Sequence, residues 1–205
     1  MTEDDVEILD HQTAYRGYFR IDRYRLRHRT FAGGWTGEMT REIFERGHAV
    51  AVLLYDPERD QVVLIEQFRL ASHAAGRPAW QLEVVAGMVE AGENLEAVAR
   101  REIREETGCS ATDMVPICDY MPSPGACTES VALFCARVDA RTAGGVHGLA
   151  HEHEDIRTRV VDADEAIALL DGGQLINSPI IITLGWLARH RERLRALWSA
   201  PPAAC

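Results

Sequence analysis

Residues 87–109, GMVEAGENLEAVARREIREETGC, contain the segment that decides the fold. The part from residue 94 to residue 107 has the apolar spacing of an amphipathic helix, and Gly108 is suited to the left-handed position that ends one. Such a helix normally turns an apolar stripe to the core and its charges to water. In this segment glutamates fall on the apolar stripe, and their placement needs a chemical reason.

The apolar arc of this helix is the reference for placing its glutamates. The arc is formed by Leu95, Val98, Ala99 and Ile103. Glu102 and Glu106 project near the middle of the arc, and Glu105 borders it one turn from Glu102. A carboxylate that is directed into a core costs several kcal/mol unless it is paired or binds a cation.

Two kinds of partner could compensate these carboxylates. One kind is a salt bridge to a neighbouring arginine, but Arg100, Arg101 and Arg104 lie on the flanks or the far side of the same wheel. Arg101 can reach one glutamate and cannot serve all three. The other kind is a divalent cation, because the spacing i, i+3, i+4 places three oxygen-rich side chains within one turn, which suits Mg²⁺ or Mn²⁺. The spacing alone leaves both alternatives open.

The composition limits the classes of function. The 205 residues suffice for one domain, or for one domain with an extra segment, with a sizeable core. The net charge of −10 argues against a surface that coats nucleic acid. If the substrate is a polyanion, a bound divalent cation is the natural source of positive charge.

The remaining compositional signals indicate a cytoplasmic protein. The five cysteines are Cys109, Cys118, Cys127, Cys135 and Cys205. Their number is odd and no two have CxxC spacing, so we expect reduced thiols rather than a zinc site or a disulfide framework. The acidic start MTEDDVEILD is unlike a secretory or transit peptide, and no apolar run approaches the length of a membrane helix.

The pattern along the chain predicts a mixed α/β or α+β domain. Strands are predicted at 49–55, 61–68, 80–87, 113–120, 129–138 and 155–161, helices at 94–107, 162–172 and 178–198, and a loop at 71–78. Residues 1–46 are rich in arginine and aromatic residues and alternate like strands, but they have no clear core. We therefore expect a β segment at 1–46 that pairs with another subunit, and a main domain at 47–205.

The segment 87–109 resembles the Nudix box. That box is a glycine, five residues, a glutamate, seven residues, and then Arg-Glu-aliphatic-any-Glu-Glu-any-Gly-aliphatic. The matching positions are Gly87, Glu93, Arg101, Glu102, Ile103, Glu105, Glu106 and Gly108. The one departure is Cys109 at the final aliphatic position, where cysteine serves as a small hydrophobe.

The Nudix resemblance implies a fold and a reaction. The fold is a mixed β-sheet sandwiched between helices, and the reaction is metal-dependent hydrolysis of a nucleoside diphosphate linked to another group. Two or three Mg²⁺ ions per site are implied, with Mn²⁺ as the alternative. The metal ligands implied by position in and beside the box are the Ala86 carbonyl, Glu102, Glu105 and Glu106. Glu93 and Arg101 would pair to hold the loop–helix–loop together, with Gly87 and Gly108 as its structural glycines.

Residues outside the box bear on the substrate. Pro124, fifteen residues after Cys109 in SPGACTES, resembles the marker of the ADP-ribose pyrophosphatase subfamily, although SPG also suits a plain turn. REIFERGHA, VVLIEQFR, GLAHEHEDIR and the C-terminal helix also resemble bacterial members of that subfamily. The resemblance extends from about Tyr15 to Trp198.

Substrate-binding residues are implied by position in the same way. They are Arg41 and Arg69 for the diphosphate or terminal ribose, Glu129 for the ribose side, Pro124 and Gly125 in the loop, and Tyr18 or Phe19 to stack on adenine. Arginine suits phosphate because its fork pairs bidentately. Taken alone, Arg41 and Arg69 would be surface charges at strand ends.

The stretch HEHEDIR supplies the rest of the chemistry by resemblance. Glu152 is placed as the base that activates water, acting with Glu102 and Glu106, and Glu154 as a further metal ligand. If Glu152 is not the base, Glu154 is the next candidate. His151 and His153 are expected to be solvated loop residues rather than transition-metal ligands.

The resulting expectation is an enzyme that hydrolyses ADP-ribose to AMP and ribose 5-phosphate. One alternative is a Nudix pyrophosphatase of nucleotide sugars such as GDP-mannose. A second is a non-catalytic module that senses ADP-ribose, but every box glutamate is present and the length leaves no room for a DNA-binding domain. The resemblance also implies a homodimer with exchanged or paired N-terminal strands. Neither nucleic acid nor membrane is an expected partner.

Overall fold

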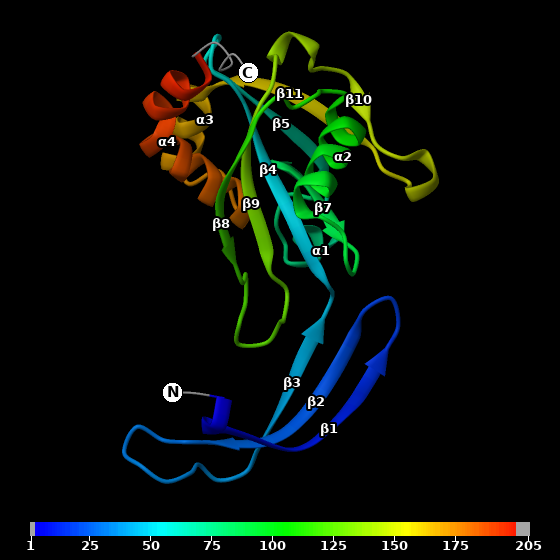
Figure 1. Cartoon of the computed structure of the whole chain (residues 1–205). Helices are drawn as coiled ribbons and strands as arrows, with labels where there is room; N and C mark the ends of the chain where they lie inside the picture. Colours follow the sequence, from blue (N-terminus) through cyan, green and yellow to red (C-terminus); the bar gives the residue numbers. More distant parts are fainter. Residues whose placement is uncertain (1–2, 200–205) are drawn as a thin grey trace. The chain divides into compact units, whose positions relative to one another are not determined.

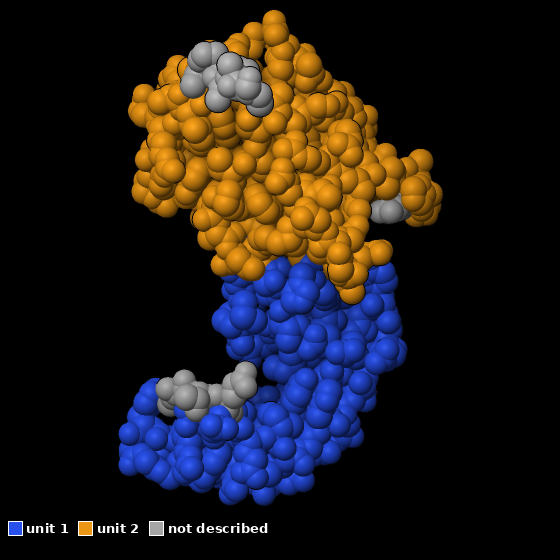
Figure 2. Space-filling model, in the orientation of Figure 1, with its two compact units in different colours: residues 1–48, 120–130 blue, residues 49–119, 131–205 orange. Residues whose placement is uncertain are grey.

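The computed structural model describes residues 3–199, and within that range the side chains of Glu3 and Glu152 are not described. The chain divides into two compact units, which are treated separately below (Figure 2). The first unit is Met1–His48 with Tyr120–Ser130, and the second is Ala49–Asp119 with Val131–Cys205. The functional roles that were predicted for residues 1–46 and 47–205 stay predictions.

The first unit is a three-stranded antiparallel sheet with a loop bonded to its last strand. A short 3₁₀ helix, η1 (Glu3–Asp5), precedes β1 (Val6–Arg16), β2 (Arg20–His28) and β3 (Met39–Glu45), which pair in the order β1-β2-β3. The loop from residue 120 to residue 130 is held by Phe44, whose N–H donates to the Ala126 carbonyl at 2.7 Å. Most side chains of these strands are exposed, as expected for a segment with no core of its own.

The second unit contains a mixed sheet. Its strands are β4 (His48–Asp56), β5 (Gln61–Phe68), β6 (Trp80–Glu83), β7 (Val85–Val89), β8 (Met114–Tyr120), β9 (Val131–Arg137), β10 (Val146–His147) and β11 (Ile156–Asp162). The order is β10-β11-β5-β4-β9-β8, with β6 paired to β5 and β7 paired to β4. β4 runs parallel to β9 and antiparallel to β5, so the centre of the sheet contains both a parallel and an antiparallel strand pair.

Helices cover both faces of this sheet (Figure 1). They are α1 (Leu70–Ala74), α2 (Leu95–Thr107), α3 (Ala163–Asp171) and α4 (Ser178–Ser199), with short 3₁₀ turns η2 (Ala140–Thr142) and η3 (Ala150–Glu152). α2 lies on one side, and α3 and α4 lie on the other. The mixed α+β sandwich that was predicted is therefore the observed architecture. No helix of the described part of the chain is long and apolar enough to cross a membrane.

The core explains why α2 is fixed against the sheet. Val98, Ala99 and Ile103 of α2 are buried in one cluster with alternate residues of β4, including Val50 and Val52. Alternate side chains of a strand point to opposite faces, so one half of β4 packs on α2 and the other half faces away from it. The helix begins at a cap, where Asn94 Oδ1 accepts from Ala97 N–H at 3.0 Å. It ends at Gly108, whose φ of 70° suits glycine.

Two predicted elements differ from the structure. The loop predicted at 71–78 contains α1, because the N–H groups of His73 and Ala75 bond to the carbonyls of Arg69 and Ala71. The strand predicted at 80–87 is divided into β6 and β7, because the chain changes its neighbour there from β5 to β4. The two-residue strand β10 was not predicted. The other predicted strands and helices agree with the structure to within two residues at each end.

Candidate functional site

The three predicted glutamates of α2 are buried to different degrees. Glu106 is 4% exposed. The side chain of Glu102 is 15% exposed, and that of Glu105 is 34% exposed. This order is the one that the helical wheel predicted, with Glu102 and Glu106 directed inward and Glu105 at the border.

Glu106 is the carboxylate with the least favourable surroundings for a negative charge. Burial raises its pKa to about 8, although the Ala86 N–H donates to its Oε2 at 3.1 Å. The charges of Glu102 and Glu154 raise that pKa further, and Arg69 lowers it. No cationic group within the described part of the chain forms an ion pair with Glu106. Its ionised form therefore needs positive charge from elsewhere.

Arg101 accounts for part of the charge on α2. Its Nη1 donates to Glu93 Oε1 at 2.8 Å, which is the pair that the Nudix resemblance implies. Its Nη2 donates to Glu102 Oε1 at 3.0 Å, and its Nε lies 4.0 Å from Glu105 Oε2. Arg101 thus reaches two of the three predicted metal ligands on α2 rather than one, but not Glu106. Burial raises the pKa of Glu102, while the hydrogen bond and charge of Arg101 lower it, and the net direction is upward.

Gly87 allows the start of the box to touch α2. A Cβ on this residue would lie 2.2 Å from the carboxyl carbon of Glu102, a distance that real structures do not tolerate. The absent side chain lets the Glu102 carboxylate lie directly against the backbone beside Ala86. Because Ala86 also bonds to Glu106, one backbone segment contacts both inward carboxylates.

The loop from residue 148 to residue 155 is attached to the C-terminal end of α2. Gly148 N–H donates to the Glu105 carbonyl at 3.4 Å. Within the loop, Glu154 Oε2 accepts from Leu149 N–H at 3.2 Å. Gly148 has a φ of +102°, and a Cβ there would meet the Cβ of Glu154 at 2.7 Å. Because Gly148 has no side chain, Glu154 can pack directly against the backbone of residue 148.

Glu152 and the two histidines belong to the same loop. The backbone of Glu152 ends η3, but its side chain lies outside the described part of the structure. Its predicted role as base therefore stays a prediction. His151 and His153 are exposed, and His153 has a left-handed φ of 57°.

The donor set has the chemistry that a hard divalent cation requires. Among the residues whose side chains are described, no three His, Cys, Asp or Glu side chains already close around a single point. The predicted ligands are nevertheless all oxygen donors, and the charges of Glu102, Glu106 and Glu154 act on one another. A buried carboxylate with no cationic partner among such groups fits Mg²⁺ or Mn²⁺.

Arg69 follows β5 and forms a bidentate pair with Glu83 of β6. Its Nη2 lies 2.7 Å from Glu83 Oε2. Burial lowers the pKa of Arg69, but the hydrogen bonds and charge of Glu83 and the charges of Glu106 and Glu154 raise it overall. The predicted diphosphate-binding arginine is therefore near the carboxylates of the predicted metal site.

The other predicted substrate residues belong to the first unit. Arg41 is exposed, and its Nη1 donates to the Thr40 carbonyl at 2.8 Å. Pro124 and Gly125 lie in an exposed turn. That turn is closed by hydrogen bonds from the N–H groups of Ala126 and Cys127 to the Ser123 carbonyl. How these residues combine with the carboxylates of the second unit stays a prediction.

Glu129 has a partner that the sequence did not predict. It is 8% exposed, and Arg46 Nη1 lies 3.2 Å from its Oε1. Arg46 also stands 5.9 Å from the centre of the Phe19 ring, next to a cavity of about 260 Å³. The cavity is lined by Arg16, Gly17, Tyr18, Phe19, Arg20, Glu45 and Gly47. Arg46 is the second arginine of REIFERGHA, so the sequence shows a charge that needs a partner. That partner, Glu129, is 83 positions away in sequence.

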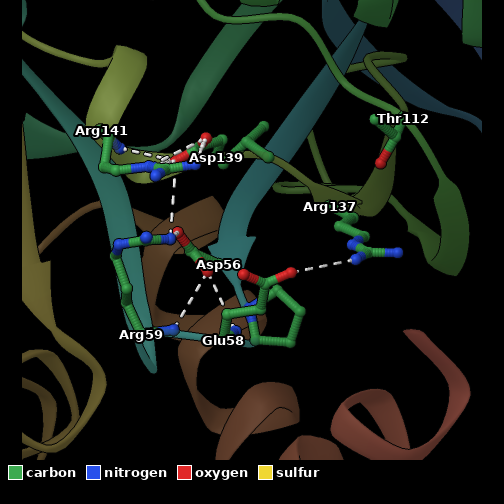
Figure 3. Close-up of a pocket in the computed structure, with 9 residues that line it drawn as sticks. Asp56, Glu58, Arg59, Thr112, Arg137, Asp139 and Arg141 are labelled. Atoms are coloured by element: carbon green, nitrogen blue, oxygen red, sulfur yellow. Dashed lines mark hydrogen bonds and ion pairs between the residues drawn. The ribbon is translucent and has the colours of Figure 1, made fainter. Parts of the chain in front are cut away.

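A further cavity, of about 240 Å³, contains none of the predicted site residues (Figure 3). It is lined by Asp56, Pro57, Glu58, Arg59, Thr112, Arg137, Val138, Asp139 and Arg141. Its charged groups already pair with one another, as in Arg59 with Asp56 at 3.0 Å and Arg141 with Asp139 at 2.6 Å. These pairs leave little net charge for a ligand, so the carboxylates around α2 are the better candidate site.

Comparison with known proteins gives matches over most of the chain. The NUDIX domain family matches residues 45–183. An ADP-ribose pyrophosphatase of Escherichia coli (strain K12) is 46% identical over 197 residues, which cover 96% of this chain and 94% of that protein. A GDP-mannose pyrophosphatase of Citrobacter koseri is 34% identical over 152 residues, which cover 72% and 76%. A solved structure described as an ADP compounds hydrolase matches the fold with a TM-score of 0.70 at 18% identity, covering 91% of this chain and 96% of that one.

Proposed function

This chain belongs to the NUDIX domain family, and from that premise we propose that it is a Nudix hydrolase that cleaves ADP-ribose to AMP and ribose 5-phosphate. The observation that carries the proposal is the surroundings of Glu106. This carboxylate is buried, bonded to Ala86 N–H and without a cationic partner among the described residues. A divalent cation is the partner that such a carboxylate lacks.

The proposed metal site uses groups from three segments of the second unit. Glu102, Glu105 and Glu106 of α2, the Ala86 carbonyl and Glu154 would hold two or three Mg²⁺ ions. When bound, the ions would polarise the phosphates, activate water and offset the charge of the leaving phosphate. Gly87 supports this proposal because its lack of a side chain lets Glu102 lie against the backbone at residue 87, next to Ala86.

The proposed reaction is hydrolysis of the phosphoanhydride. The oxygen of a water molecule bonds to one phosphorus, and the bridging oxygen leaves with the other phosphoryl group. Glu152 accepts the proton of the attacking water. Arg69 holds the diphosphate through its guanidinium, for which its position near Glu106 and Glu154 is suitable.

The proposed substrate is ADP-ribose rather than a guanosine sugar. The support for this choice is the greater identity and coverage of the ADP-ribose pyrophosphatase relative. The aromatic group of the first unit suits stacking on a purine ring, which adenine and guanine share, so it bears on how the base is held and not on which base it is. Tyr18 is 94% exposed, whereas Phe19 packs edge-on against both Tyr18 and Phe44. We therefore propose Tyr18 for the adenine ring.

We also propose that the enzyme is a homodimer through its first unit. Val6 and Ile8, which point to the same face of β1, are 50% and 52% exposed, and Tyr15 is 62% exposed. A second copy would remove this apolar surface from water. Sedimentation equilibrium measures the mass directly: a dimer is expected for the wild type, and a wild-type monomer would contradict the proposal.

A substrate panel tests the function. The purified chain is incubated with ADP-ribose or GDP-mannose, with Mg²⁺ or with a chelator, and AMP and GMP are separated by chromatography. We expect AMP from ADP-ribose with Mg²⁺, and no product with the chelator. Preferential release of GMP would favour the nucleotide-sugar alternative. Binding of ADP-ribose without turnover would favour the sensor.

A further inference from the structure

Arg69 is held by a carboxylate that has no place in the proposed chemistry. Both Oε atoms of Glu83 lie 3.1 Å from Arg69 Nε, and Oε2 lies 2.7 Å from Nη2. Glu83 is 3% exposed, whereas the side chain of Arg69 is 43% exposed. A buried carboxylate therefore fixes one edge of a guanidinium that is itself open to solvent.

Glu83 is in turn held by two amides. Asn177 Nδ2 donates to its Oε1 at 3.1 Å, and Gln67 Nε2 lies 3.5 Å from its Oε2. Gln67 is in β5, and Asn177 is the residue directly before α4. Donors from separate elements therefore converge on one buried carboxylate, as groups that orient a functional side chain do.

The side chain of Asn177 donates to Glu83 and does not cap helix α4, which follows it. It stands directly before α4, and its carbonyl accepts from Ile181 N–H. Asparagine at this position normally caps the helix with its side-chain oxygen. Here Oδ1 is buried and has no partner in the part of the chain that the structure describes. The opposite orientation of the amide would place that oxygen against a carboxylate oxygen, so the donation to Glu83 accounts for the arrangement.

The held guanidinium keeps donors for a ligand. Nε and Nη2 of Arg69 donate to Glu83, and Nη1 has no hydrogen-bond partner among the described residues. The charges of Glu106 and Glu154 also act on Arg69. Without Glu83 the guanidinium would be free to pair with either of those carboxylates and to compete with a metal ion.

We propose that Glu83, held by Asn177 and Gln67, is a positioning residue that fixes Arg69 for the diphosphate of the substrate. The inference rests on the proposed function, in which Arg69 binds the diphosphate. A long arginine side chain that is ordered before binding does not lose that rotamer freedom when the substrate arrives. Its free donors also point in a constant direction, away from the edge that Glu83 occupies.

Kinetics of the full-length chain test the proposal. Glu83→Gln keeps the shape of the side chain and removes its charge, and we expect a roughly tenfold rise in KM for ADP-ribose with kcat changed about twofold or less, as for loss of uniform binding. Arg69→Ala should raise KM at least as much. Adding Glu83→Gln to Arg69→Ala should then change nothing further, because the positioning residue has lost its target.

A matched control removes a different carboxylate from an arginine on the same sheet. Glu66 of β5 pairs with Arg157 and Arg159, so Glu66→Gln also leaves arginines without a partner. It should leave KM unchanged. Asn177→Ala, which removes only one donor to Glu83, should raise KM less than Glu83→Gln and have no effect in the Arg69→Ala background. Additive losses from Glu83→Gln and Arg69→Ala would overturn the proposal.

A spectroscopic signal separates failure of this inference from failure of the proposed function. The ¹⁵N-labelled Nε–H signal of Arg69, identified by its loss in Arg69→Ala, should shift and exchange faster with water in Glu83→Gln but not in Glu66→Gln. If the wild type releases no AMP and the signal still responds, the function is wrong and the positioning stands. If AMP is released and neither the signal nor KM responds to Glu83→Gln, the positioning is wrong.

Discussion

The backbone N–H of Ala86 donates to Oε2 of Glu106 at 3.1 Å, so the residue before the box glycine is bonded to the most buried carboxylate of α2. This bond joins β7 to the last full turn of the helix. The carbonyl of the same residue, in the next peptide group, is proposed as a metal ligand. One hydrogen bond therefore couples the positions of two proposed ligands that lie 20 residues apart in sequence.

Glu106→Gln should separate stability from activity. Without metal, burial raises the pKa of Glu106 to about 8, so at neutral pH folding has to take up a proton to keep this carboxyl neutral. Glutamine is neutral without that proton, so the melting temperature in a chelator should equal or exceed that of the wild type. Hydrolysis of ADP-ribose with Mg²⁺ should fall by about 100-fold or more, since metal-assisted charge stabilisation amounts to several kcal/mol. Calorimetry and AMP release measure the two effects. A fall of several degrees in the chelator would show that Glu106 is structural.

Mg²⁺ should stabilise the wild type against heat through the α2 carboxylates. At a concentration 100 times its Kd, a ligand adds about 2.7 kcal/mol to stability. For a chain of this length that corresponds to a rise of about 5–10 °C in melting temperature. Glu102→Gln should remove most of this rise, because it removes one of the proposed ligands.

The control for the Mg²⁺ measurement lies on the same helix. Glu96 is in the first turn of α2, its side chain is 53% exposed, and it pairs with Arg100 four residues later. Glu96→Gln makes the same chemical change as Glu102→Gln but away from the proposed site. It should keep the full Mg²⁺-dependent rise, and loss of the rise in both variants would point to a nonspecific effect of charge.

Glu152 and Glu154 should give different kinetic signatures. As the base, Glu152 acts only in the chemical step, so Glu152→Gln should lower kcat by roughly 10²–10⁴-fold at an unchanged Mg²⁺ requirement. As a metal ligand, Glu154 sets the affinity for the ion, so Glu154→Gln should raise the Mg²⁺ concentration that gives half-maximal rate. Initial rates over a Mg²⁺ titration measure both. The reverse pattern would assign the base to Glu154.

The fold could be predicted largely from local patterns. The helix α2, its glycine end and the inward direction of Glu102 and Glu106 all follow from residues close in sequence, and the structure agrees. The division of the 80–87 strand could not be predicted, because it depends on a change of neighbour from β5 to β4. Periodicity reports which face is buried and does not report which strand lies alongside.

The supporting residues of the site could not be predicted for the same physical reason. Glu83, Asn177 and Arg46 have partners that are far away in sequence, and no local spacing signals such pairs. The three glutamates of α2 were predictable because one helix turn brings them together. Arg101 was predicted to reach one of these glutamates and lies near two, since its side chain is long enough to cover neighbouring positions.

Asp56 should make the stability of the second unit depend on pH. This residue ends β4, is 1% exposed, and accepts hydrogen bonds from the N–H groups of Glu58 and Arg59 (Figure 3). It also accepts a hydrogen bond from the Ala140 N–H. Burial alone would raise its pKa, but the Ala140 N–H, the Arg59 N–H and side chain, and the Glu58 N–H lower it overall. A carboxyl whose pKa is lowered by folding contributes stability above its unfolded pKa of about 3.9, and that contribution is lost as the pH falls through the folded pKa.

Asp56→Asn therefore should be most destabilising at neutral pH. The amide offers one acceptor oxygen in place of two and has no charge, so we expect a loss of about 1–3 kcal/mol at pH 7 in urea unfolding. The difference from the wild type should shrink below about pH 4, where protonation removes the same charge from Asp56 itself. Glu58→Gln is the control: the Glu58 side chain is 68% exposed and lies 3.5 Å from Arg137, so its removal should cost little at any pH. A difference between wild type and Asp56→Asn that stays constant from pH 7 to pH 3 would show that the hydrogen bonds stabilise the turn without the charge.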